Sequence, residues 1–133
     1  MPSDNVEIVR AAFDAFNEEG VEGILPMIHP EFEGTTPPEL ASEPDTYRGH
    51  EGMRRYFDSF YEVMDEIRWE AHGFERVGDR VVVPMTLRAR GKTTGLAFGQ
   101  EAAMVWSLSE GKAIGLQLYP TVEEARKAAA ADS

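Results

Sequence analysis

The sequence predicts an α+β fold in which helices cover one face of an antiparallel sheet. Apolar residues recur at helical spacing in the first half of the chain and at every second position from Ile67 onward. The strands follow one another through short turns, and no strand–helix–strand unit is present that would build a parallel sheet. A strongly curved sheet with helices on its concave side would leave a blind apolar pocket between the two layers.

Three helical segments and one short strand are expected before Ile67. The first helix runs from near Asp4 to Gly20 and has an apolar face made of Val6, Val9, Phe13 and Phe16. A short helix follows from Val21 and ends at His29-Pro30, because proline disfavours helix for the residue before it. Residues 31–36 alternate as a strand, and 37–48 form a proline-containing loop. The third helix starts at Gly49 to Gly52, and its apolar face is Met53, Phe57, Phe60 and Met64.

Three alternating runs predict the main strands. The first run has Val81, Val83, Met85, Leu87 and Ala89 on one face, and the third has Ile114, Leu116 and Leu118. The second contains Leu96, Phe98, Gln100, Ala102, Met104, Trp106 and Leu108, in which Gln100 is the only polar residue. Glycine-containing turns separate the runs. Thr121 and Glu124 form a capping box that starts a C-terminal helix.

Length and charge exclude several classes of function. The 133 residues are enough for one domain spanning 1–133, and 13 Lys and Arg against 24 Asp and Glu give a net charge of -11. Such a chain repels nucleic acid and anionic membranes. It contains no cysteine, which excludes disulfides and zinc–thiolate sites. No apolar stretch resembles a membrane span or a signal peptide, so a cytoplasmic protein is expected.

Several fragments together resemble one known family. They are HPEFE at 29–33, YRGHEGMRRYF at 47–57, GDRVVV at 78–83 and YPTVEEA at 119–125. In this order and spacing, over nearly the whole chain, they resemble the SnoaL-like branch of the nuclear transport factor 2-like superfamily. The resemblance implies a cone-shaped, curved antiparallel or mixed sheet wrapped around the N-terminal helices, enclosing an apolar pocket. It also implies a homodimer packed through the outer face of the sheet.

Ketosteroid isomerases, the polyketide cyclase relatives with the best-known chemistry, can be compared residue by residue. Their general base is an Asp near the end of the first strand, and a Tyr and a protonated Asp form the oxyanion hole. The corresponding positions here are Thr36, Ala12 and either Ala103 or Met104. None of these positions carries the Asp or Tyr that the isomerases use, which argues against isomerase chemistry of that type.

Two residues are candidates for catalysis. Gln100 shares the alternation of Ala102 and Met104, so it is expected to point into the pocket, either to orient a substrate or as a core amide bonded to backbone. His72 lies on the strand before Gly78 and is the only plausible base, although a lone histidine is more often a surface residue. No metal site is expected, because His29, His50 and His72 match no ligand spacing.

The inward-facing residues predict a binding site for a small hydrophobic molecule that carries one or two oxygens. The predicted ligand-binding residues are Phe13, Phe16, Phe32, Thr36, Tyr56, Phe57, Phe60, Val83, Met85, Leu87, Phe98, Met104, Trp106, Leu116 and Leu118. The outer face, with Arg88, Arg90, Glu101, Ala103, Val105, Gln117 and Tyr119, suits a moderately polar dimer interface.

Two classes of function remain open at this point. The first is a small-molecule-binding protein with isomerase, cyclase or hydrolase activity that needs no cofactor. The second is a non-catalytic ligand-binding or protein-interaction module of the same fold. In the first case mutations in the pocket should matter most, and in the interaction case mutations on the outer face of the sheet should.

Overall fold

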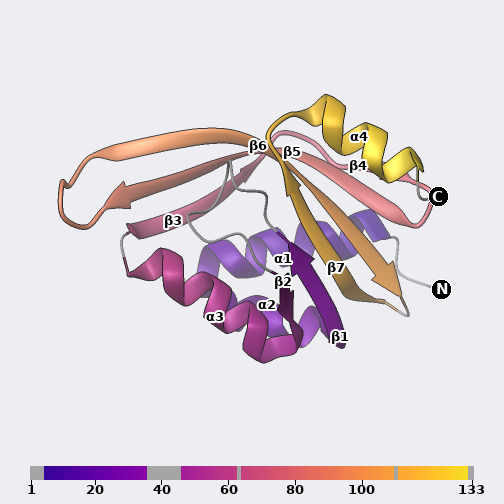
Figure 1. Cartoon of the computed structure of the whole chain (residues 1–133), viewed down its shortest axis with the longest axis horizontal. Helices are drawn as coiled ribbons and strands as arrows, with labels where there is room; N and C mark the ends of the chain where they lie inside the picture. The colour runs from indigo at the N-terminus through magenta and orange to yellow at the C-terminus, as the bar shows by residue number, and fades with distance from the viewer. Residues whose placement is uncertain (1–4, 36–45, 63, 110, 132–133) are drawn as a thin grey trace.

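The structure is a computed structural model that describes residues 5–35, 46–62, 64–109 and 111–131 (Figure 1). The helices are α1 (Asn5–Glu19), α2 (Val21–Ile24), α3 (Gly49–Tyr61) and α4 (Val122–Ala131), and a 3-10 turn, η1 (Leu25–Met27), follows α2. The strands are β1 (Ile28–Thr35), β2 (Thr46–Arg48), β3 (Met64–Ala71), β4 (Glu75–Val77), β5 (Arg80–Gly91), β6 (Ala97–Ser109) and β7 (Lys112–Tyr119). The predicted α+β class is confirmed.

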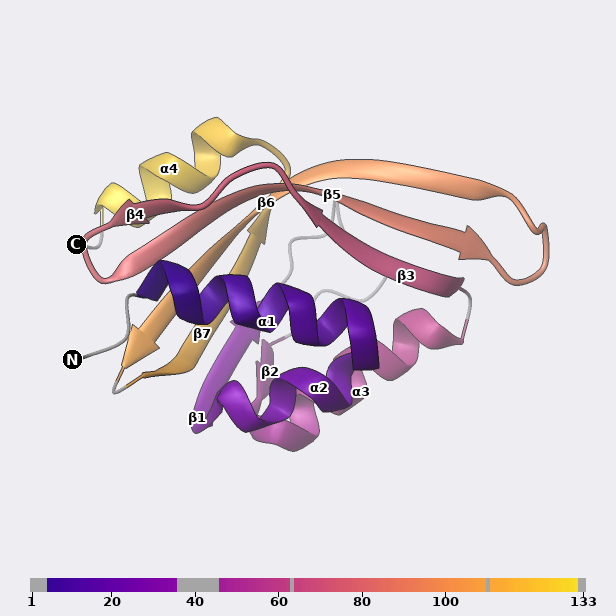
Figure 2. The same cartoon turned by 180° about the vertical axis from the view of Figure 1, so that it is seen from behind.

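The seven strands form one mixed sheet in the order β2-β1-β7-β6-β5-β3, with β4 paired to β5. Every pairing is antiparallel except that of β1 with β7, which is parallel. The sheet curls into a half-barrel, with α1, α2 and α3 on its concave side and α4 on its convex side (Figures 1 and 2). We call these the inner and outer faces.

The inner face carries the main core because the strands alternate as predicted. Val81, Val83 and Met85 of β5 and Met104 and Trp106 of β6 are all buried in one hydrophobic cluster. The buried face of α1 packs onto this cluster through Val9, Ala12, Phe13 and Phe16, which recur at three- and four-residue spacing.

A second, smaller core lies on the outer face beneath α4. Ala125 and Ala129 are fully buried against Val82, Ala103 and Val105. The predicted capping box forms, since Thr121 Oγ1 accepts a hydrogen bond from the Glu124 backbone N–H at 3.2 Å. Because α4 covers Ala103 and Val105, these two residues are not available for the dimer interface predicted from the sequence.

The N-terminal half differs from the sequence-based expectation in three places. One is that α3 ends at Tyr61, so Met64, expected on the apolar face of that helix, begins β3 instead. The second helix ends as a 3-10 turn at Met27, so β1 begins at Ile28 rather than at Glu31. Pro26 explains the early end, since its ring is tolerated in the first turn but not inside a helix. Residues 46–48 pair with β1 as β2 instead of belonging to a loop. No helix in the described part of the chain is long and apolar enough to cross a membrane.

Candidate functional site

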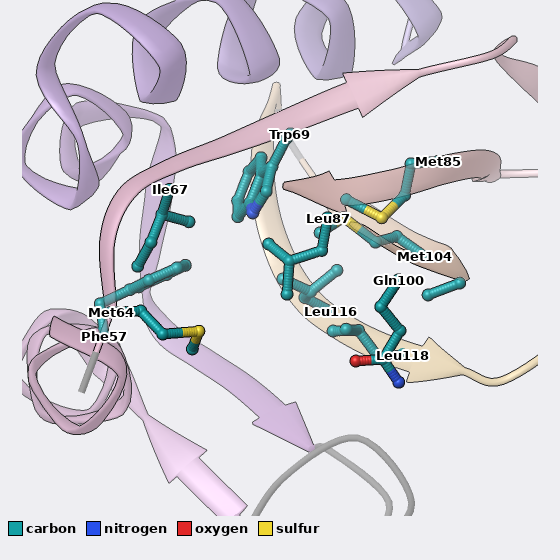
Figure 3. Close-up of a pocket in the computed structure, with 11 residues that line it drawn as sticks. Phe57, Met64, Ile67, Trp69, Met85, Leu87, Gln100, Met104, Leu116 and Leu118 are labelled. Carbon is teal, nitrogen blue, oxygen red and sulfur yellow. The ribbon is translucent and has the colours of Figure 1, made fainter. Parts of the chain in front are cut away.

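A small cavity of about 30 Å³ lies between α3 and the inner face of the sheet (Figure 3). Phe57 of α3 and residues of four strands surround it. The strand residues are Met64, Ile67 and Trp69 of β3, Met85 and Leu87 of β5, Gln100, Ala102 and Met104 of β6, and Leu116 and Leu118 of β7. Gln100 is the single polar residue among these eleven.

Strand register explains why Gln100 reaches the pocket. Gln100 lies opposite Leu87, and Ala102 lies opposite Met85, so both members of each pair share the inner face. The structure therefore places Gln100 where the alternation predicts it. The Gln100 side chain is half-buried and shows no hydrogen bond to the described residues. Its role in catalysis stays a prediction.

A bulge in β3 lets Met64 face the cavity together with Ile67 and Trp69. Asp65 lies opposite Arg90 and Arg68 lies opposite Arg88, so β3 has one residue more than β5 between these pairs. Glu66 has a φ of 54°, in the left-handed region that non-glycine residues rarely adopt. Ile67 and Trp69 face inward by ordinary alternation, and because of the extra residue Met64, opposite Gly91, faces inward as well.

Trp69 forms one wall of the pocket and is held by aromatic neighbours. Its ring stacks on Phe16 with centroids 3.9 Å apart and an interplanar angle of 11°, and Phe57 lies 5.8 Å away. Only 4% of Trp69 is exposed. Met64 was missed in the sequence because helical spacing assigned it to the third helix, whereas Ile67 and Trp69 were missed although they alternate with Arg68 and Glu70.

His72 lies away from the pocket, on the outer face. Its side chain is exposed, and its Nε2 lies 2.6 Å from Oγ1 of Thr86, which belongs to the outer row of β5. Near it, the hydrogen bond from Arg88 holds the pKa of Glu70 below its usual value, and the charges of Arg88 and His72 act in the same direction. The structure therefore does not bring His72 to the position of a base in the cavity.

The predicted ligand-binding residues divide into three groups. Those that line the cavity are Phe57, Met85, Leu87, Met104, Leu116 and Leu118. Those that pack in the surrounding core instead are Phe13, Phe16, Phe32, Val83 and Trp106. Thr36 lies outside the described residues, as do the side chains of Tyr56, Phe60 and Phe98. Alternation reveals which residues face inward, but not which of them border empty space.

The cavity is smaller than a ligand. A volume of about 30 Å³ has room for about two water molecules, whereas sites for drug-sized molecules are about 300–1,000 Å³. Binding would thus require lining side chains to change rotamer. Met64, Met85 and Met104 suit this requirement, because the unbranched methionine side chain adapts its shape readily.

Comparison with known protein families identifies the fold independently. The model of the SnoaL-like domain matches residues 9–115, which is most of the chain. The chain belongs to the SnoaL-like domain family. The family resemblance inferred from the sequence fragments is therefore confirmed. No curated protein matches the chain.

Solved structures share this architecture over nearly their whole length. TerC, co-crystallised with polyporic acid, is 25% identical, with a TM-score of 0.79 and coverage of 96% of this chain and 98% of TerC. An NTF2-like protein of unknown function from Burkholderia pseudomallei K96243 is 23% identical, with a TM-score of 0.78 and coverage of 94% and 96%. A protein of Jannaschia sp. CCS1, provisionally assigned as a SnoaL-like polyketide cyclase, is 18% identical, with a TM-score of 0.72 and coverage of 96% and 92%. The latter two likenesses show the fold alone.

Proposed function

We propose that this SnoaL-like protein binds a small, mainly apolar molecule that carries a hydrogen-bonding oxygen, and that it does so in the pocket between α3 and the sheet. The observation that carries the proposal is the composition of the wall. Gln100 is the single polar residue among eleven lining residues, and its amide has no hydrogen-bond partner among the described residues. TerC, a protein of the same architecture, was co-crystallised with polyporic acid.

The two kinds of lining group select for different parts of a ligand. Apolar surface removed from water stabilises a complex by about 25 cal/mol per Å². Closing an apolar ligand over Gln100 would leave the amide without water or a partner, which costs about 1–3 kcal/mol. An oxygen placed against the Gln100 amide removes that cost. The amide both donates and accepts, so either a carbonyl or a hydroxyl fits.

The same pocket would serve an enzyme without a cofactor or a non-catalytic binder. As an enzyme, the protein would perform isomerase, cyclase or hydrolase chemistry in which Gln100 orients the substrate. The lining favours the binder, because among the described residues it offers an amide but no group that exchanges protons near neutral pH.

A matched pair of ligands tests the proposed role of Gln100. The probes are 1-naphthol and 1-methylnaphthalene, which have nearly the same shape but differ in the oxygen. We expect the wild type to bind 1-naphthol at least about fivefold more tightly, which corresponds to a hydrogen-bond difference of about 1 kcal/mol. Gln100→Leu should remove this preference while keeping affinity for 1-methylnaphthalene. Isothermal titration calorimetry measures both constants.

Gln117→Leu is the control for this experiment. It makes the same chemical change on an exposed outer position of β7, so the preference for 1-naphthol should persist. A wild type that binds neither probe would contradict the proposed function. A Gln100→Leu variant that still prefers 1-naphthol would remove Gln100 from recognition.

We also propose that a second copy of the chain covers the part of the outer face that α4 leaves open. This part lies over β3, β5 and β6, beside the hairpin that extends past the helices (Figure 1). Two of its charges already have partners, since Arg88 donates two hydrogen bonds to Glu70 at 2.9 and 3.0 Å. Arg68 and Glu101 are both exposed and form no ion pair within 4.0 Å among the described residues, although the charge of Glu101 acts on nearby Arg88.

Arg68 and Glu101 are placed symmetrically around Leu87. Arg68 lies opposite Arg88 on one side of β5, and Glu101 lies opposite Thr86 on the other. Strand spacings put their Cα atoms about 12 Å apart. A two-fold axis in the interface, above Leu87 and at right angles to the Arg68–Glu101 line, would set Arg68 of each copy over Glu101 of the other. This self-complementarity supports a symmetric dimer.

A further inference from the structure

The side chain of Asn17 on α1 binds both backbone polar groups of Trp69. Its Nδ2 donates to the Trp69 carbonyl oxygen at 2.9 Å, and its Oδ1 accepts from the Trp69 N–H at 2.9 Å. The primary amide thus pairs with Trp69 as a neighbouring strand would. Both bonds are partly buried and join residues 52 positions apart in the chain.

The position of Trp69 in the sheet explains why these groups need a partner. Strand β3 lies at the edge of the sheet, where β5 is its one partner among the described strands. The His72 N–H donates to the Pro84 carbonyl, and in an antiparallel ladder the hydrogen-bonded pairs occur at every second residue. Trp69 opposite Leu87 falls between such pairs, so its N–H and C=O point away from β5. A buried backbone pair left open there would be costly.

Helix α1 therefore fixes Trp69 at two points. Asn17 holds its backbone, while the preceding residue, Phe16, stacks on its indole ring at 3.9 Å. Trp69 in turn forms a wall of the pocket (Figure 3). We propose that Asn17 is a positioning residue that sets the place of Trp69 and thereby the shape of the binding pocket. The consequence for binding rests on the proposed function, but the positioning of Trp69 does not.

The chemistry of the amide makes this inference specific. Alanine at position 17 would leave both Trp69 groups open. An ionised aspartate would still accept from the N–H but would set a negative oxygen against the carbonyl. A protonated aspartic acid, in contrast, has one oxygen that accepts and one O–H that donates, so it can replace the amide in both bonds.

The test uses Trp69 as its own reporter. The chain has two tryptophans, so in a Trp106→Phe background every tryptophan signal comes from Trp69. In that background we expect Asn17→Ala to weaken the near-ultraviolet circular dichroism of Trp69, raise its quenching by acrylamide, and weaken 1-naphthol binding about tenfold. Asn5→Ala is the matched control. Asn5 lies on the same helix and also donates to a backbone carbonyl, that of Asp79, but on an exposed surface.

Asn17→Asp gives the second variant, in case the alanine variant does not fold. We expect its Trp69 signals to be perturbed at neutral pH and to return to those of the background protein as acid protonates the introduced carboxyl. Asp14, Glu18 and Glu19 on α1, and Arg68 and Glu70 on β3, are the titratable groups nearest in sequence. They are present in both proteins, so the background protein at each pH corrects for their titration.

The outcomes separate this inference from the proposed function. Unchanged Trp69 signals in folded Asn17→Ala, or no recovery of Asn17→Asp in acid, would overturn the positioning role. If the wild type fails to bind 1-naphthol while the Trp69 signals respond as expected, the proposed function fails and the positioning role stands.

Discussion

Replacing Trp69 by alanine is expected to lower the free energy of unfolding by about 3–5 kcal/mol. Trp69 is 4% exposed, and its ring lies 3.9 to 6.2 Å from the rings of Phe13, Phe16, Phe57 and Trp106. Alanine cannot fill this space, and helices α1 and α3 both lose their aromatic contacts with β3. Since a domain of this size is stable by about 5–15 kcal/mol, the variant would be close to unfolding. Urea denaturation followed by far-ultraviolet circular dichroism measures the change.

Leu96→Ala is the control for Trp69→Ala. Leu96 is also a large apolar residue, but 69% of it is exposed, so its truncation should change stability by less than about 0.5 kcal/mol. A loss below about 1 kcal/mol for Trp69→Ala would show that the aromatic cluster does not hold α1 and α3 to the sheet.

Arg68→Glu is expected to dissociate the proposed dimer. The two-fold axis makes each substitution act twice, so one charge reversal sets two pairs of like charges against each other across the interface. We expect the dissociation constant to rise at least about tenfold, and less so at high salt, where charges are screened. Sedimentation velocity over a range of protein concentrations measures the constant. Glu101→Arg should have the same effect.

The reversed pair distinguishes this contact from a general charge effect. Arg68→Glu combined with Glu101→Arg restores opposite charges and should restore the dimer. Lys127→Glu, an equal change of charge on the exposed side of α4, should leave the dimer intact. A monomeric wild type, or a double variant as weak as the single variants, would contradict the proposed interface.

Much of the site could be predicted because β5 and β6 pair without interruption. Their register runs from Arg80 opposite Ser107 to Arg90 opposite Ala97 with no shift. A strict period of two along the chain therefore becomes a strict division between inner and outer faces. This is why Gln100, Met85 and Met104 are found in the pocket wall.

The remaining differences have identifiable physical causes. The bulge at Glu66 changes which residues of β3 face inward, and no glycine marks its left-handed position. Met64 was therefore overlooked, and the structure finds His72 beside Thr86 on the outer face. The place of α4 was also hidden, because the small residues Ala125 and Ala129 give little sign of which surface they bury. These features depend on contacts between residues far apart in the sequence.

The central claim is that a ligand enters the pocket bordered by Met64, Met85 and Met104. The chain has six methionines. Met27 of η1 and Met53 of α3 do not line the cavity. Labelling the methionine methyl groups with ¹³C and titrating 1-naphthol therefore tests the claim most directly by NMR. We predict saturable shifts of the Met64, Met85 and Met104 methyl signals, with those of Met27 and Met53 nearly unchanged. Saturable binding that leaves the three pocket methionines unmoved, or no binding at all, would contradict the account.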